Sequence, residues 1–394
     1  MHSLFLLTVI LLFASNVTAE VLKRVEVIGN KRTTKSAIIQ TGKIKIGQEL
    51  SQEELVTIKE NLGRIGQIRI IRVDFSDGIL TIVVIDKWTL IPIPMFTKSG
   101  SYHNRGLVLY EDNFLGSLGT LAPGVSWSNS LFNFLLYYQD ESLFSPEIGI
   151  KFLLMRKSDY SEFKKAGRLV DAHETRYDSY FITPNYLYKD HVFKAGPVYI
   201  DKSIYRDDVP IARDISKGIF FRHHWNAYQI LEVMYDGMVT TFDLYALKQQ
   251  NGRVALLSEA NVSWSVPVDD NFLNFGVHGA LSSEKSYLFA KNLGGDEGFR
   301  GHDKASFPTW QNLGGLAQYQ RHLFNRLYLS PFYEYNNSKL ITPILHGKRL
   351  SENTMGMGLR YYFKKISIPA VIFDAARNIE DKSTHFHINI GLSI

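Results

Sequence analysis

The residues best suited to chemistry lie in one glycine-rich segment, GGDEGFRGHDKASF, which runs from Gly294 to Phe307. Glycine permits backbone torsions with φ above zero and close packing against a wall. Arg300 lies between Phe299 and Gly301, and its planar guanidinium can bind a carboxylate through paired hydrogen bonds. The segment therefore predicts a long turn between strands whose arginine has an acidic partner elsewhere. A solvated hairpin with an incidental arginine is the alternative.

Two other groups of polar residues are candidates for catalysis or metal binding. One group lies in the same segment and comprises Asp296, Glu297, His302 and Asp303. An acid–base site would need a nucleophile in an activated context such as GxSxG, and the sequence contains none. The other group is His385 and His387, on one face of a predicted strand, where no third metal ligand follows at a telling spacing. We therefore expect no enzyme, no catalytic residue, no metal and no cofactor.

Composition indicates a folded chain rich in strands. Hydrophobic residues make up 45% and charged residues 21% of the 394 residues, which excludes a disordered chain. Tyr (21) and Phe (25) are abundant, and aromatic side chains are typical of strands and of the interfacial girdles of membrane barrels. The absence of cysteine excludes disulfides and thiol catalysis. The net charge of +5 is spread among acidic residues along the chain, so nucleic acid is not an expected partner.

The N-terminus predicts an export signal over residues 1–19. Leu4 to Ala14 is an apolar core too short to span a bilayer, and Val17-Thr18-Ala19 is a small-residue cleavage site. The first three residues carry no Lys or Arg, which is atypical for such a signal. We expect the mature chain to begin near Glu20. Since no other run reaches about 18 apolar residues, a membrane would have to be crossed by a closed barrel.

Residues 20–87 predict a small α+β domain in the order strand, helix, helix, strand, strand. Val21 to Val27 alternates as a strand does, and Thr33 or Thr34 can cap a helix that Gly42 closes. A capping box follows, Ser51 with Glu54, and opens an amphipathic helix. The last two strands, Ile68–Phe75 and Gly78–Ile85, are joined through Ser76-Asp77-Gly78, a strong hairpin signal.

This order resembles a POTRA domain, the periplasmic module that precedes Omp85-family barrels. The wording that carries the resemblance is VEVIGN, GQELSQEELVTIKENLGRIGQIRIIRVDF and GILTIVVID. The chain departs from the family at Gln67-Ile68, where an aromatic is common, and at Asp86, where Glu is more usual. A generic α+β domain is the alternative. The resemblance implies capture of a client polypeptide, and an exposed sheet edge provides a physical means through β-augmentation.

Residues 97–394 predict a long series of strands separated by turns with Asn, Gly, Asp, Ser or Pro. About 300 residues in strands of about 9–11 residues plus connections give about sixteen strands, with twelve or fourteen left open. We therefore predict a mainly β fold, a transmembrane antiparallel β-barrel preceded by the small βααββ domain. The candidate strands include Leu107–Tyr110, Thr120–Trp127, Leu231–Met238, Ser286–Phe289, Leu327–Tyr335 and Ile366–Phe373.

Three wordings in this region resemble the Omp85 barrel. YEDNFLG, Tyr110 to Gly116, is similar to the family's first barrel hairpin, and FRGH, Phe299 to His302, is similar to the Arg-Gly motif of the sixth extracellular loop. FYEYN, Phe332 to Asn336, falls where the family carries Phe-x-Asp-x-Gly. In a strand Phe332 and Glu334 face the same way. The resemblance implies that Arg300 and Glu334 form an ion pair that pins the loop in the lumen, although Glu and Asn replace the family's Asp and Gly.

The C-terminus resembles the recognition strand that ends outer-membrane proteins, except that the last residue is Ile where Phe or Trp is usual. Apolar residues alternate there with polar ones, which predicts a lipid face and a lumen face. The apolar set is Phe386, Ile388, Ile390, Leu392 and Ile394.

The Omp85 resemblance implies outer-membrane protein assembly or polypeptide translocation. The expected location is the bacterial outer membrane with the N-terminal domain in the periplasm. The expected partners are outer-membrane lipid, client polypeptides and periplasmic accessory proteins. A single POTRA-like domain is few for the family's central assembly factors, which favours a specialised role. The alternative is a passive outer-membrane pore or binding protein on the same fold.

Overall fold

The computed structural model describes residues 20–63, 66–129, 131–165, 168–231, 234–295, 298–304, 306–342, 346–362 and 369–390. The expected export signal, residues 1–19, lies outside them. The chain forms two units, one with residues up to Thr89 plus Asp112–Gly119 and the other with the remaining residues. Among the described residues, no helix is both long and apolar enough to cross a membrane.

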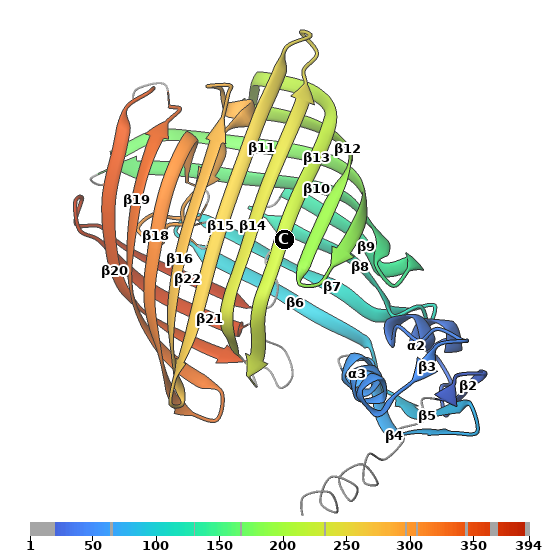
Figure 1. The fold of residues 1–394 in the computed structure, drawn as a ribbon. Coiled ribbons are helices and arrows are strands. Elements are labelled where there is room, and N and C mark those ends of the chain that lie inside the picture. The colour runs from blue at the N-terminus through green and yellow to red at the C-terminus, as the bar shows by residue number, and fades with distance from the viewer. Residues whose placement is uncertain are drawn as a thin grey trace, which may run out of the picture. The chain divides into compact units, whose positions relative to one another are not determined.

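The first unit is a small α+β domain with the expected order of elements (Figure 1). Its three-stranded sheet has the order β2-β5-β4, with β2 parallel to β5, and a core that includes Leu22, Ile38 and Leu62. A short pair, β1 with β3, stands apart from this sheet. The elements are β1 Glu20–Val21, β2 Arg24–Ile28, α2 Lys35–Thr41, β3 Glu49–Leu50, α3 Gln52–Gly63, β4 Ile68–Ser76 and β5 Ile79–Asp86.

Local signals of the sequence account for the ends of these elements. Thr34 caps α2 by accepting the N–H of Ala37 at 3.2 Å. The capping box before α3 is reciprocal, since the Ser51 N–H donates to Glu54 at 2.7 Å and the Glu54 N–H donates to the Ser51 hydroxyl at 3.2 Å. Asp77 and Gly78 both have positive φ, 56° and 76°, as a two-residue hairpin turn requires. These predictions are confirmed.

Asp86, at the end of β5, fastens the segment between β2 and α2. Its carboxylate accepts the N–H groups of Lys31 and Arg32 at 2.5 and 2.7 Å and the Thr33 hydroxyl at 2.6 Å. Burial acts to raise the pKa of Asp86, but the hydrogen bonds from Thr33, Arg32 and Lys31 outweigh it, so the pKa lies below its ordinary value of 3.8. The ionised Asp86 carboxylate thus holds this segment beside the end of β5.

The second unit is a closed antiparallel barrel of sixteen long strands, β6–β16 and β18–β22, with the short β17 added beside β18 (Figure 1). The predicted fold class and strand count are confirmed. The strands are β6 Leu90–Ser99, β7 Tyr102–Phe114, β8 Gly119–Ser128, β9 Leu131–Ser145, β10 Ile148–Lys165, β11 Arg168–Tyr188, β12 His191–Arg206, β13 Val209–Leu231, β14 Met234–Lys248, β15 Val254–Val268, β16 Asn271–Ser282, β17 Lys291–Leu293, β18 Phe307–Phe324, β19 Leu327–Leu340, β20 Arg349–Tyr362, β21 Pro369–Asn378 and β22 Thr384–Ile390.

The structure differs from the sequence prediction at the start of β6 and at the end of β7. The barrel begins at Leu90 rather than at residue 97, because β6 contains Pro92 and Pro94, which lack the N–H donors that mark a strand. The YEDNFLG segment ends β7 and begins the turn to β8. It therefore belongs to the second hairpin of the barrel, not the first.

Two predicted strands are wrong. Leu231–Met238 is not one strand, since it covers the last residue of β13 and the first residues of β14. Ser286–Phe289 contains a 3-10 helix, η1 Tyr287–Phe289. Both segments are apolar enough to resemble strands, and short apolar runs do not distinguish strand from other buried structure.

Side chains alternate along the strands between a buried inner face and an exposed outer face. Along β19 the buried set is Tyr328, Ser330, Phe332, Glu334, Asn336, Ser338 and Leu340. Exposed aromatic residues of the outer face include Trp127, Phe132, Tyr186, Tyr188, Trp264, Phe275 and Tyr333. This is the pattern of a barrel with an apolar exterior and a largely polar interior.

The barrel closes where β22 pairs with β6. Among the described residues this pairing has four residue pairs, from His387 with Ser99 to Ile390 with Phe96. By contrast, β10 and β11 share eighteen pairs. The described part of the closing contact ends at Ile390, the last residue of β22.

Candidate functional site

The connection from β16 to β18, residues 283–306, forms what we term the internal loop. It contains η1 and β17, and β17 pairs Leu293 with Phe307 and Lys291 with Thr309 of β18. Gly294 and Gly295 then turn the chain with φ of 129° and 61°. A Cβ at Gly294 would lie 2.0 Å from the Asp303 carbonyl oxygen, so only glycine permits this fold of the loop.

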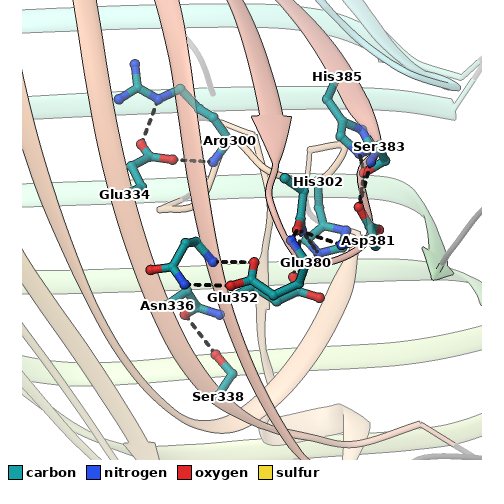
Figure 2. A network of polar contacts seen from close by, with 12 residues as sticks. Arg300, His302, Glu334, Asn336, Ser338, Glu352, Glu380, Asp381, Ser383 and His385 are labelled. Carbon is teal, nitrogen blue, oxygen red and sulfur yellow. Dashed lines mark hydrogen bonds and ion pairs between the residues drawn. The ribbon is translucent and has the colours of Figure 1, made fainter.

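Arg300 of the internal loop is bound by Glu334 of β19, as Figure 2 shows. The guanidinium Nε donates to Glu334 Oε1 at 2.7 Å, and the Arg300 backbone N–H donates to Oε2 at 2.8 Å. The guanidinium carbon lies 3.4 Å from the centre of the Phe332 ring, a close cation–π contact. Both charged residues are 6% exposed. One carboxylate therefore holds both the side chain and the backbone of the loop.

A second carboxylate, Asp374 of β21, extends this ion pair into a network. Its Oδ2 lies 3.3 Å from Nη1 of Arg300, and its Oδ1 lies 3.1 Å from Nη1 of Arg360. The four side chains Arg300, Arg360, Glu334 and Asp374 thus balance two positive with two negative charges. Balance and hydrogen bonding are what buried charges require.

The residues after Arg300 bind neighbouring strands in turn. His302 contacts Glu352 of β20 through Nε2 at 2.5 Å. Asp303 contacts His385 of β22 at 2.9 Å, and the Lys304 N–H donates to Ser99 of β6 at 2.6 Å. We term Arg300–Lys304, together with these partners and the charged network around Arg300 described above, the polar anchor of the loop.

The two residues beside Arg300 serve packing. Phe299 is fully buried with Phe163, Leu293, Phe307, Leu340 and Leu350. Gly301 lies so close to the wall that a Cβ would be 2.1 Å from the Thr354 hydroxyl and 2.8 Å from the Phe299 ring. Each residue of the Phe-Arg-Gly sequence therefore has a separate structural role: burial for Phe, the ion pair for Arg and a close approach to the wall for Gly.

The other end of the internal loop is held by apolar packing. Phe289 of η1 packs on inward-facing residues of five consecutive strands, namely Phe181, Val198, Ile200, Phe220, Leu247 and Ala255. Nearby, the Tyr287 hydroxyl donates to Asp171 of β11 at 2.8 Å. We term Phe289 with these six residues the apolar anchor. Since the two anchors use different arcs of the barrel wall, the loop crosses the lumen.

The remaining predicted site residues are placed as follows. Phe386 is 56% exposed and His387 is buried, whereas Ile388, Asn389 and Ile390 are all half-buried; the C-terminal recognition strand therefore stays a prediction. His387 contacts Ser99 at 2.8 Å and the Arg300 carbonyl at 2.9 Å, which uses both ring nitrogens within the protein. No metal-binding group of three His, Asp or Glu occurs among the described residues. Leu392, Ile394, Asp296 and Glu297 lie outside the described residues.

Several residues of the polar anchor were not predicted. Asp374, Arg360 and Glu352 lie on strands far along the chain, and no spacing connects them to Arg300. The available signal was weak: each is a charged residue in an alternating strand, at a position whose neighbours two residues away face the lumen. Such a pattern indicates that a charged side chain faces the lumen, but it does not indicate which residue is its partner.

Comparisons with known proteins bear on the fold. Neither a scan of protein-family models nor a search of curated proteins found a match. Among solved structures, BamA from Haemophilus ducreyi lacking POTRA domains 1–3 is similar, with a TM-score of 0.64 and 14% identity over 94% of this chain and 84% of that one.

Two CdiB structures are also similar. CdiB from Acinetobacter baumannii has a TM-score of 0.66 and 12% identity over 95% of this chain and 74% of its own. CdiB from Escherichia coli has a TM-score of 0.55 and 11% identity over 96% and 92%. The chain therefore has the fold of the Omp85 barrels over nearly its whole length, as the resemblance of its motifs implied.

Proposed function

We propose that this protein is an outer-membrane barrel that inserts or translocates other polypeptides. The observation that carries the proposal is the internal loop, which crosses the lumen and is fastened at both ends by buried contacts. A lumen occupied by a fastened loop is less suited to a large, stable conductance than an open channel. The shared fold with BamA and CdiB supports the same proposal.

The outer face of the barrel supports insertion in a membrane. Its exposed aromatic residues, among them Trp127, Tyr188 and Trp264, have the chemistry of interfacial girdles. We propose that residues 1–19 are removed on export and that the N-terminal domain lies in the periplasm. Unboiled protein should migrate faster on a gel than boiled protein and should fractionate with the outer membrane. Soluble recovery without a heat shift would rule this out.

The N-terminal domain is proposed to capture the client, because both outer strands of its sheet, β2 and β4, have one open side within the order β2-β5-β4. Such edges accept an extended chain through backbone hydrogen bonds. A photoreactive amino acid at the exposed Ile71 of β4 should crosslink to client chains in cells. The matched control is the exposed Lys59 of helix α3. Equal crosslinking from both positions would contradict edge capture.

Depletion of the protein tests the function itself. We expect a defined set of outer-membrane or secreted proteins to be lost from the outer-membrane proteome, and the same proteins to be recovered with the crosslinked Ile71 variant. If depletion left the proteome unchanged and the purified protein showed large, stable conductance, the passive pore would replace this proposal.

A further inference from the structure

The barrel interior contains two adjoining cavities away from the polar anchor. One has a volume of about 340 Å³ and is lined by polar residues that include Lys157, Thr175 and Lys202. The other has a volume of about 180 Å³ and is lined mostly by apolar residues that include Ile200, Leu257 and Leu288. The linings share Tyr177, Lys202, Glu259, Ala290 and Lys291, so the two cavities meet.

The charges of the described residues around the polar cavity leave one ammonium without an acidic partner. Lys157 lies 3.2 Å from Asp159, and Lys291 is bonded to Glu259. Among the described residues, Lys202 donates to the Ala290 carbonyl at 3.5 Å, which is long for a hydrogen bond. Three lysines and two carboxylates therefore surround this cavity, and the surplus positive charge is on Lys202.

A hydroxyl beside Lys202 also has unused hydrogen-bonding capacity. Thr175 is 8% exposed, and its Oγ1 is buried without a hydrogen-bond partner among the described residues. Thr175 and Tyr177 face inward on β11, and Tyr177 pairs directly with Lys202 of β12. A buried polar atom without a partner is costly. An anion between Lys202 and Thr175 would satisfy both.

The apolar cavity indicates what the anion carries. Barrel interiors are normally polar, whereas here Leu247, Leu257 and Leu288 line a space that begins at the same lysine. Small-molecule sites combine a mostly apolar wall with a few placed polar groups and have volumes of about 300–1,000 Å³. A ligand with a charged head at Lys202 and an apolar chain along η1 would match the polar and apolar cavities.

We propose that the two cavities together bind a single-chain amphiphile with a carboxylate head, such as a medium-chain fatty acid. The carboxylate lies between Lys202 and Thr175, and the acyl chain lies against Leu257, Leu288 and the apolar anchor. The proposal rests on the barrel interior and is independent of the client-handling function.

Photocrosslinking of the full chain in nanodiscs of zwitterionic lipid tests the site, with a diazirine analogue of lauric acid as the probe. We expect crosslinks on inward residues such as Tyr177 and Leu288, and competition by laurate but not by lauryl alcohol. Lys202→Met should reduce labelling about tenfold, since it removes a charge-assisted contact. Thr175→Val should reduce it less, and it remains informative if Lys202→Met does not fold.

The matched control is Lys217→Met, because Lys217 of β13 is exposed on the outer face and should leave labelling unchanged. Crosslinks confined to outer-face residues such as Tyr180, or equal labelling of Lys202→Met and the parent protein, would overturn the proposal. Competition by inorganic phosphate as strong as that by laurate would also overturn it, because the acyl chain would then contribute nothing.

Discussion

Two of the attachments of the internal loop use opposite kinds of interaction. At the polar anchor, Arg300 and Glu334 are both 6% exposed and joined by two hydrogen bonds. At the apolar anchor, Phe289 is 7% exposed and packs among residues of five strands. The first depends on geometry and charge balance, and the second depends on area removed from water.

This difference predicts how each attachment fails. A buried ion pair contributes little net stability over an apolar replacement, yet losing one member leaves an uncompensated charge at high cost. Apolar packing weakens in proportion to the area and volume removed. Substitutions that remove one charge at the polar anchor should therefore be strongly destabilising. At the apolar anchor, the loss of stability should instead grow with the volume of side chain removed.

Reversal of charge at the polar anchor should have the largest effect. Arg300→Glu places a carboxylate beside Glu334 and Asp374, and we expect a loss of about 3–5 kcal/mol in stability, with the loop released to protease. Arg321→Glu on β18 is the control, since Arg321 is exposed. Thermal loss of the heat-modifiable band measures the effect. Equal midpoints for the two variants would mean that the buried pair does not hold the loop.

Truncation at the apolar anchor should be slightly milder. Phe289→Ala should cost about 3 kcal/mol, near the lower end of values for a buried Phe, and the loss should be independent of salt. Phe144→Ala, at a 65% exposed position, should cost little. A salt-dependent loss in Phe289→Ala would indicate that the two anchors are not separate.

A close approach within the polar anchor gives a smaller and reversible effect. Gly301→Ala should cost about 1–3 kcal/mol through overpacking against Thr354. Adding Thr354→Ala should recover part of the loss, because it removes the clashing hydroxyl, whose oxygen has no hydrogen-bond partner among the described residues. The midpoints of the two single variants and the double variant measure this. Additive losses would show that the Thr354 contact is not the obstacle.

Asp86 offers a comparison outside the barrel, since it also holds backbone N–H groups with a carboxylate. Its folded pKa lies below the ordinary 3.8, so the stability it contributes is complete above the unfolded pKa and is lost as pH falls through the folded pKa. We expect Asp86→Asn to flatten the acid limb of the domain's unfolding curve, followed by tryptophan fluorescence of Trp88. An unchanged acid limb would contradict this role.

The sequence predicted the parts of the fold that local chemistry determines. The capping box at Ser51, the Asp77-Gly78 turn and the alternation of β19 each depend on residues close in the chain, and each is confirmed. The start of β6 was missed because its prolines resemble a break. The boundary between β13 and β14 was missed because apolar residues lie on both sides of it.

The candidate site could be predicted only where a recognisable motif marked it. Arg300 and Glu334 stood in wordings that resemble a known family, and the structure places them together. No motif marked Phe289. An apolar residue that faces the lumen cannot be told from any other apolar strand residue until the opposite wall of the barrel is known. Predicting the roles of Asp374 and Arg360 would have required the pairing register of the barrel strands, which cannot be read from one strand alone.

The most direct test of the account is a double-mutant cycle on Arg300 and Glu334. The single variants Arg300→Glu and Glu334→Arg should each free the loop to protease and impair client assembly. The double variant should recover part of both losses, and not all, because Glu at position 300 would still face Asp374 and the two side chains differ in geometry. A coupling of about 2 kcal/mol is expected. If the double variant were the sum of the singles, or if the singles behaved as the parent protein, the loop would not be held by this pair.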